Sequence, residues 1–501
     1  MKKARILLIT PNLKGIKDGL NRIQPSLGLM TIAQSLINNN HIVKIHDTAL
    51  EGWENKVDLG DNKVLIGQTD EEIENVIREF NPDIVGISIL FSNLNESGHT
   101  IARIVKKINK KIWVFTGGNH ITNSLIDYQH NITHPGDDIP LIKDLEDKNI
   151  DLALVGEGDF TVVDLVNKII NNQDISKIPG LLKQVSRGKY FNNPSDRLIN
   201  LDNLPIPARH LVNMEGYFDI GAFHSAKSRS NRVLNIMCSR GCPEKCTFCT
   251  TPQMWGSNVR WRKMEDIMLE IKDGVKKFDI GEIQFEDDTI TARKKNLIEL
   301  CNGLEKIGLP WCTPNGIKTN YHLANQPDMF KAMYESGCYQ VTLACESGVQ
   351  RVLDHVVNKR LKVDQIKPAI ENAKKAGLLV HTFWILGYPG ETFEEMNQTI
   401  EFALSTGADS FSFSILSPLP GTPIYRKVVK ENLWWDGKSL NDLMFRSSLV
   451  KVDGFDGPNQ FEKFVNEANL KANLILKQRD PKRFAFKYGK DANEKSLIKQ
   501  T

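Results

Sequence analysis

Hydrophobic positions in the first third of the chain form short apolar runs, and segments of helical spacing separate these runs. The segment 27–38 is typical, because Leu29, Ala33 and Leu36 recur at helical spacing and share one face. The expected strands cover 4–10, 42–46, 83–90, 112–116 and 152–155, and further helices cover 71–80 and 100–108. This alternation predicts an α/β domain of the doubly wound, Rossmann-like class, with a parallel sheet and helices on both faces.

A second series of strand and helix signals covers residues 232–418. Its expected strands are 233–237, 283–286, 316–319, 340–344, 379–386 and 411–416, and its expected helices include 264–276, 294–307, 327–336 and 363–376. Six such repeats predict a partial (βα)6 barrel of the TIM type, although periodicity alone leaves a second open sheet as the alternative. Beyond residue 445, apolar positions between Phe461 and Ile475 predict a small helical C-terminal segment.

We therefore expect four parts along the chain. They are a first α/β domain (1–170), a connector (171–230), a barrel (231–445) and a C-terminal helical segment with a tail (446–501). The connector is expected because turn residues such as Pro179-Gly180 and Pro205-Ile206-Pro207 punctuate it, and no long period holds there.

Composition narrows the class of protein only slightly. The 501 residues are 41% hydrophobic and 25% charged, as in ordinary globular proteins, and the net charge is +3. So weak a charge gives no electrostatic reason to expect a nucleic-acid partner or a membrane surface. No apolar stretch is long enough to span a membrane, and the apolar run near the N-terminus is too short for a signal peptide. We therefore expect a cytoplasmic protein.

Cysteines give the first chemical signal. Four of the eight lie close together, at positions 238, 242, 246 and 249. Clustered cysteines in a long chain of this kind bind metal or do chemistry more often than they form disulfides. A zinc site usually needs four ligands in paired units, and the chain has no second pair. The spacing of Cys242, Cys246 and Cys249 suits three irons of a cubane and leaves the fourth iron open. A zinc knuckle or a buried hydrophobic trio is the alternative.

With Gly241 before the trio and Phe248 inside it, the three-cysteine motif closely resembles that of the radical S-adenosylmethionine (SAM) superfamily. The resemblance implies that the trio holds a 4Fe-4S cluster whose open iron binds SAM, and that Cys238 is not a ligand. One-electron reduction of the bound SAM would give a 5′-deoxyadenosyl radical.

Three segments at later strand ends extend the resemblance. They are Phe285-Glu286-Asp287-Asp288, Ala344-Cys345-Glu346-Ser347-Gly348 and Gly387-Tyr388-Pro389-Gly390-Glu391. The resemblance implies that SAM is bound by Phe248, Glu286, Asp287, Glu346 and Gly387. Each segment also has a structural interpretation: Asp288 suits a helix N-cap, Glu346 suits an ion pair, and the glycine turn, like Pro418–Tyr425, suits a tight bend.

Polar and glycine residues follow several strands of the first domain, at the edge where doubly wound sheets bind ligands. In their order ahead of the barrel, these segments resemble the cobalamin-binding domain of one large subgroup of the superfamily. The resemblance implies that cobalamin is bound by Pro11, Asn12, Ser88, Gly117, Gly118, His120 and Glu157.

One departure from cobalamin-binding domains concerns the ligand of cobalt. The segment Asp47–Gly52 keeps the frame of an Asp-x-His-x-x-Gly motif, but Ala49 stands where the histidine would be, and alanine cannot ligate a metal. His120 is the nearest alternative ligand, and we interpret it instead as a residue that hydrogen-bonds within the loop or to the corrin amides.

The resemblance implies a cobalamin-dependent radical SAM enzyme that methylates an unactivated carbon or phosphorus of a small-molecule substrate. It also implies an electron donor such as flavodoxin or ferredoxin. A non-methylating oxidative cyclase or ring-rearranging enzyme would use the same parts. An RNA methylthiotransferase would need a second cluster, for which Cys301, Cys312, Cys338 and Cys345 lack the spacing. A non-enzymatic cobalamin-binding protein would leave the cysteine motif unexplained.

Overall fold

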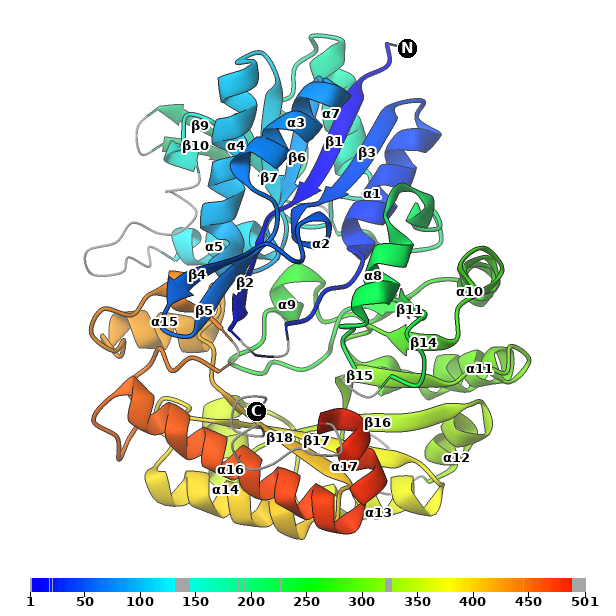
Figure 1. Ribbon diagram of the computed structural model, residues 1–501, viewed down its shortest axis with the longest axis vertical. Coiled ribbons are helices and arrows are strands. Elements are labelled where there is room, and N and C mark those ends of the chain that lie inside the picture. Colours follow the sequence, from blue (N-terminus) through cyan, green and yellow to red (C-terminus); the bar gives the residue numbers. More distant parts are fainter. Residues whose placement is uncertain are drawn as a thin grey trace.

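The computed structural model describes residues 2–17, 19, 21–130, 145–186, 189–192, 195, 197–225, 228–319, 327–444 and 446–488. Residues 489–501 of the expected tail therefore lie outside the described residues. Two α/β units lie one above the other along the long axis of the molecule, the N-terminal one uppermost in Figure 1. None of the helices in the described ranges is both long and apolar enough to span a membrane.

The first unit is built on a seven-stranded sheet. In spatial order its strands are β10 (Lys189–Asn192), β9 (Leu181–Ser186), β8 (Leu152–Leu154), β7 (Trp113–Gly117), β6 (Ile84–Ser88), β1 (Arg5–Thr10) and β3 (Ile42–Asp47). The strands from β8 to β3 are parallel, whereas β9 and β10 are antiparallel additions. From β1 the chain adds β3 on one side, and it then adds β6 and the later strands on the other side. The strand order therefore reverses between β1 and β6, and doubly wound sheets bind ligands at such a point.

Helices cover both faces of this sheet because its strands are apolar on both faces. Leu7 and Ile9 of β1 join one hydrophobic cluster, and Ile6 and Leu8 join the other. The covering helices are α1 (Leu27–Asn38), α3 (Asp70–Phe80), α4 (Asn95–Ile108), α5 (Asn119–Gln129) and α7 (Thr161–Ile170), with the short η1 (Ser92–Leu94) and α2 (Thr48–Glu51). The doubly wound class is thereby confirmed.

A small antiparallel sheet of three strands was not foreseen. Its order is β2 (Leu13–Ile16), β5 (Lys63–Ile66) and β4 (Lys56–Gly60), and every residue of β4 is exposed. Lys63 of this sheet forms an ion pair of 2.7 Å with Asp442, close to the C-terminal segment. The small sheet therefore links the first unit to the segment that precedes α16.

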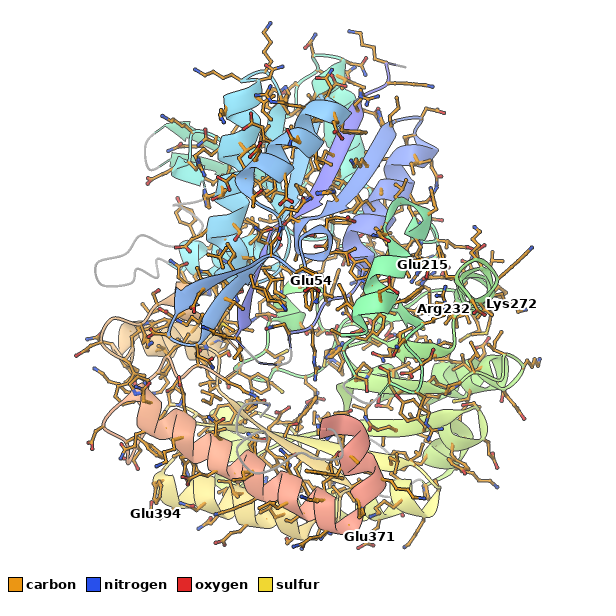
Figure 2. The ribbon with its side chains drawn as sticks, in the orientation of Figure 1. Glu54, Glu215, Arg232, Lys272, Glu371 and Glu394 are labelled. Carbon is orange, nitrogen blue, oxygen red and sulfur yellow. The ribbon has the colours of Figure 1, made fainter. Side chains whose placement is uncertain are left out.

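The stretch expected as a connector packs onto both units. Its first part supplies β9 and β10, and its second part contains η2 (Arg209–Leu211) and α8 (Met214–Ile220). Glu215 of α8 accepts two hydrogen bonds from the guanidinium of Arg232, at 2.7 and 2.8 Å, and Figure 2 labels both side chains. This bidentate pair ties α8 to the residue that precedes the first barrel strand.

The second unit is a six-stranded parallel sheet whose strands follow chain order. They are β11 (Val233–Ile236), β14 (Glu282–Phe285), β15 (Trp311–Lys318), β16 (Cys338–Glu346), β17 (Leu379–Leu386) and β18 (Ser410–Ile415). The helices between them are α10 (Met264–Phe278), α11 (Lys294–Glu305), α12 (Asp328–Glu335), α13 (Ile366–Lys375) and α14 (Phe393–Ser405). Sequential parallel order with one helix per strand confirms the partial barrel.

The long C-terminal helix α16 (Pro458–Arg479) closes the barrel's free edge at β18. The side-chain amide of Asn469 accepts a hydrogen bond from the backbone N–H of Phe413 (3.0 Å) and donates one to its carbonyl (2.8 Å). Shorter elements complete the unit: β12 (Ser239–Arg240), α9 (Thr251–Met254), β13 (Arg260–Trp261), η3 (Ile290–Ala292), η4 (Val352–Val357), η5 (Val363–Gln365), α15 (Pro423–Lys430), η6 (Leu440–Asp442) and α17 (Pro481–Tyr488). The expected C-terminal helix is confirmed.

Candidate active site

The three cysteines of the motif lie on one loop that follows β12. All three are free thiols, and none is fully buried. The thiol pKa of Cys242 is raised to about 11 and that of Cys246 to about 12, mainly by burial and to a smaller extent by the neighbouring cysteines. The three sulfurs are therefore close enough to affect one another's charge. A cationic metal group would relieve that mutual repulsion, so the loop fits a multi-thiolate centre.

Backbone hydrogen bonds hold this loop in place. The N–H of Cys242 donates to Gly256 (3.2 Å). Thr247 donates its N–H to the carbonyl of Val357 (2.9 Å) and its hydroxyl to that of Val356 (2.7 Å). Both acceptors end η4, a π-helix, and π-helical turns often occur at functional sites.

Gly241 is required by close packing. Its φ is +107°, and a Cβ on it would come within 2.3 Å of the carbonyl oxygen of Asn258. No residue with a side chain fits directly before Cys242 without moving backbone.

A single-ion site receives no support. Within the described ranges, no three His, Cys, Asp or Glu side chains converge as ligands of one metal ion. A cubane binds one cysteine per iron, so its three ligands need not converge on a point.

The two aspartates after β14 differ in their contacts. Asp287 accepts hydrogen bonds from the N–H groups of Cys238 (3.0 Å) and Ser239 (2.6 Å), and burial raises its pKa to about 7. It therefore anchors the turn that leads into the cysteine loop.

Asp288 accepts a hydrogen bond from the hydroxyl of Thr251 (2.9 Å). After burial and other contributions, its charge also raises the thiol pKa of Cys242 and Cys249. The residue that caps η3 is Thr289, so Asp288 does not have the N-cap position that its sequence suggested. Asp288 is one of the carboxylates beside the cysteines, and it is not among the site residues expected from the sequence.

Glu346 forms a buried ion pair of 2.8 Å with Lys359. Burial opposes the charge on Lys359, but the adjacent Glu346 raises the pKa of this lysine. Glu346 has a φ of +67°, a strained conformation for a residue with a side chain, and such strain often occurs at functional sites. Lys359 lowers the thiol pKa of Cys246 and Glu346 raises it, so both side chains lie beside the cysteine loop.

The turn at Gly387 is held by its own residues. Glu391 accepts hydrogen bonds from the N–H groups of Gly387 (2.9 Å) and Tyr388 (3.1 Å). A Cβ on Gly387 would come within 2.7 Å of the ring of Phe461, so the close approach of α16 explains this glycine. Phe248 packs near Tyr388, with ring centroids 6.0 Å apart.

Glu286 lies where the two units meet. It accepts a hydrogen bond from His224 Nδ1 (2.8 Å), and its backbone carbonyl accepts one from Asn315 (2.7 Å). Arg22, from the loop before α1, donates to the backbone carbonyl of His224. Residues from three distant parts of the chain therefore surround the end of β14.

The residues expected to contact cobalamin come mainly from one edge of the first sheet. Pro11 and Asn12 follow β1, and Ser88 and Gly117 are paired in the register of β6 and β7. Gly118 has a φ of +109°, and a Cβ on it would come within 2.6 Å of the carbonyl oxygen of Ile89.

His120 is buried, and its Nδ1 lies 2.9 Å from the hydroxyl of Ser92. This contact agrees with the interpretation of His120 as a hydrogen-bonding residue. In the segment that lacks the histidine, Asp47 instead caps α2 and accepts a hydrogen bond from Tyr217 (2.6 Å), while Ala49 is buried.

Glu157 belongs to a buried ionic network between the units. Arg240 lies 3.0 Å from Glu157 and 2.7 Å from Asp159, and Arg260 lies 2.7 Å from Glu157. The guanidinium of Arg240 also stacks over Trp255, 4.6 Å from the ring centroid. The loop after β8 is thereby fixed to the antiparallel pair of β12 and β13, and Arg240 lies two residues before the first cysteine of the motif.

A second contact between the units involves the segment Pro418–Tyr425. Asp127 of α5 accepts a hydrogen bond from the N–H of Gly421 (2.6 Å) and lies 3.6 Å from Arg426. Gly421 has a φ of +82°, and a Cβ on it would come within 2.8 Å of the carbonyl oxygen of Asn123. This turn therefore serves to join the barrel to the first unit.

Asp127 predicts a pH dependence of stability. Burial raises its pKa to about 7, so the folded state binds a proton that the unfolded state releases near pH 4. The stabilisation of the folded state by this proton is fully present below pH 4 and is lost as pH rises through 7. We expect the thermal midpoint of the wild type to fall between about pH 5 and pH 8, and Asp127→Asn to reduce that fall. Identical pH profiles of the two proteins in calorimetry would contradict this assignment.

Comparison with known proteins agrees with this arrangement. The family described as the radical SAM superfamily matches residues 236–403, and the B12 binding domain family matches residues 16–139. Cytidylyl-2-hydroxyethylphosphonate methyltransferase of Streptomyces wedmorensis is 31% identical, over 93% of this chain and 90% of its own length. An uncharacterised methyltransferase of Pyrococcus horikoshii is 32% identical, over 86% of this chain and 85% of its own length.

Among solved structures, the cobalamin-dependent SAM radical enzyme OxsB, with aqua-cobalamin and SAM bound, has a TM-score of 0.67. The match has 15% sequence identity and covers 95% of this chain and 67% of OxsB. At that identity the match supports the fold, and it extends across both units.

Proposed function

Because the chain belongs to the radical SAM superfamily, in the branch with an N-terminal B12 binding domain, we propose that it methylates an unactivated carbon or phosphorus of a small molecule. The chain is an enzyme of the cobalamin-dependent methyltransferase group, and its cofactors are a 4Fe-4S cluster, SAM and cobalamin. When bound, these groups supply a reductively generated adenosyl radical and a transferable methyl group.

One contact carries the proposal. Asn119, at the edge of the first sheet beside Gly118, donates a hydrogen bond to the hydroxyl of Thr250 (3.4 Å), the residue after Cys249. The edge expected to bind cobalamin and the loop expected to bind the cluster therefore meet directly. Such contact supports methyl transfer, because the methyl donor and the radical must act on one substrate.

Individual residues follow from the same geometry. We assign cluster binding to Cys242, Cys246 and Cys249, and we add Asp288 as an acceptor for the α-ammonium group of SAM. Asp287 and Gly387 then position the backbone around the site. Glu346 contributes through its ion pair with Lys359.

The substrate is proposed from the relative. By its name, the Streptomyces enzyme acts on a cytidylyl phosphonate, so a phosphonate or nucleotide conjugate is the first candidate. Arg22, which lies where the units meet, provides a guanidinium that suits such an anionic group. The reductant is proposed to be a flavodoxin or a ferredoxin.

The test is anaerobic incubation of the reconstituted enzyme with candidate substrates, reductant and SAM that carries a deuterated methyl group. We expect a product that gains one labelled methyl group, with 5′-deoxyadenosine formed in equal amount. A product that loses hydrogen without gaining the label would instead identify an oxidative cyclase. Mass spectrometry distinguishes these outcomes.

A further inference from the structure

The outer side of the cysteine loop is exposed and basic. Lys245 is exposed, and it directly precedes Cys246, so their Cα atoms are about 3.8 Å apart. Arg360 is 70% exposed and donates a hydrogen bond to the carbonyl of Pro243 (3.0 Å). Asn358 donates to the carbonyl of Lys245 (3.3 Å). The segment after the π-helix therefore lies directly on the loop that carries the cysteines.

We define the basic rim as Lys245, Arg360 and Lys362. Glu244, beneath the rim, is buried and forms ion pairs with both Arg360 and Lys318, so two cations face this one carboxylate. Lys362 is 61% exposed and lies 3.5 Å from Asp354. Glu244 and Asp354 offset two of the four charges of Lys245, Lys318, Arg360 and Lys362, so the rim keeps a small excess of positive charge.

Local charge of this kind favours an acidic protein partner. Complementary charges accelerate encounter and orient the two partners, and the resulting complexes weaken as salt increases. Redox carriers form short-lived complexes with small interfaces, so a rim of a few cations is sufficient to bind one. Lys245, which is exposed beside Cys246, also offers a short route for an electron.

We propose that the basic rim is the docking surface of an acidic one-electron carrier protein. The inference rests on the proposed function, because the electron needs an acceptor cluster on the cysteine loop. One electron leaves the reduced flavin or iron–sulfur group of the carrier, which is oxidised by one electron. That electron reduces the cluster and is then used to cleave a C–S bond of SAM. No atom passes between the proteins.

The test compares charge reversal at the rim with charge reversal elsewhere. Lys245→Glu and Lys245→Glu/Arg360→Gln are compared with the control Lys272→Glu/Lys375→Glu. These control lysines are exposed on α10 and at the end of α13, and Figure 2 labels Lys272. Binding of a fluorescently labelled bacterial flavodoxin is measured by anisotropy at low and high salt. SAM cleavage is then driven either by reduced flavodoxin or by dithionite.

We expect the rim variants to bind flavodoxin about tenfold more weakly at low salt, and the control to bind it like the wild type. Flavodoxin-driven cleavage should fall in parallel, whereas dithionite-driven cleavage by Lys245→Glu should stay unchanged. Wild-type affinity in the double variant would overturn the proposal. An equal loss with both reductants in Lys245→Glu would also overturn it, because Lys245 would then act on the site itself. Failure of the wild type to cleave SAM with dithionite would reject the proposed function, while the binding measurement would still test the docking surface.

Discussion

Replacement of Cys242, Cys246 or Cys249 by alanine is expected to abolish both cluster assembly and the formation of 5′-deoxyadenosine. Each thiolate would hold one iron of the cubane. The three cysteines lie on one loop, and this loop has no fourth cysteine that could replace a lost ligand. Loss of one ligand removes the group that accepts the electron, so SAM cleavage should fall to the background rate. Iron and sulfide analysis of anaerobically purified variants, with chromatographic measurement of 5′-deoxyadenosine, checks this expectation.

Two other cysteines provide the controls. Cys238 is fully buried four residues before the motif, and Cys312 is fully buried in β15. Cys238→Ser and Cys312→Ser should keep their iron and their SAM cleavage. If Cys238→Ser lost as much iron as Cys242→Ala, the choice of three ligands would be wrong. A triple Cys→Ala variant of the motif that still held four irons would reject the ligand assignment.

The second large effect is expected from Arg240→Met. The change leaves the carboxylate of Asp159 without its guanidinium, and Glu157 keeps only Arg260. Both carboxylates are almost completely buried, so the loss should be about 3–5 kcal/mol of stability. Urea unfolding of the purified protein, followed by circular dichroism, measures the change.

A matched control is available on the surface. Arg78 pairs with Glu74 at helical spacing on α3, and its side chain is 53% exposed. Arg78→Met should therefore cost only about 0.3–0.5 kcal/mol. Because the deficit of Arg240→Met comes from uncompensated charge, Asp159→Asn in the same chain should recover part of it. A small effect of Arg240→Met, similar to that of Arg78→Met, would show that the network does not hold the units together.

The sheets and the cysteine motif could be predicted because both are local signals. A buried parallel strand has a continuous apolar run, and the cysteine spacing fits within a single loop. Strand β15 was expected only from residue 316, because Pro314 and Asn315 interrupt its apolar run, yet it begins at Trp311. Strand β4 was missed because it has no buried position, so no hydrophobic pattern marks it.

The interpretation of individual site residues depended on partners far away in the sequence. Glu157 and Arg240 are 83 residues apart, and nothing near Glu157 indicates that an arginine will neutralise it. Asp287 and Asp288 are adjacent and chemically identical, and only the fold decides which one binds the backbone and which one faces the cysteines. Sequence order alone could not separate these roles.

The contact of Asn469 with β18 has a consequence for how the barrel ends. An open parallel sheet exposes a row of unpaired backbone groups that can recruit a strand from another molecule. The planar amide of Asn469 presents one acceptor and one donor, so it imitates a single peptide unit of a seventh strand. The side chain of Asn469 thus occupies the backbone groups that an added strand would use. At this position the incomplete barrel is protected from edge-to-edge association between molecules.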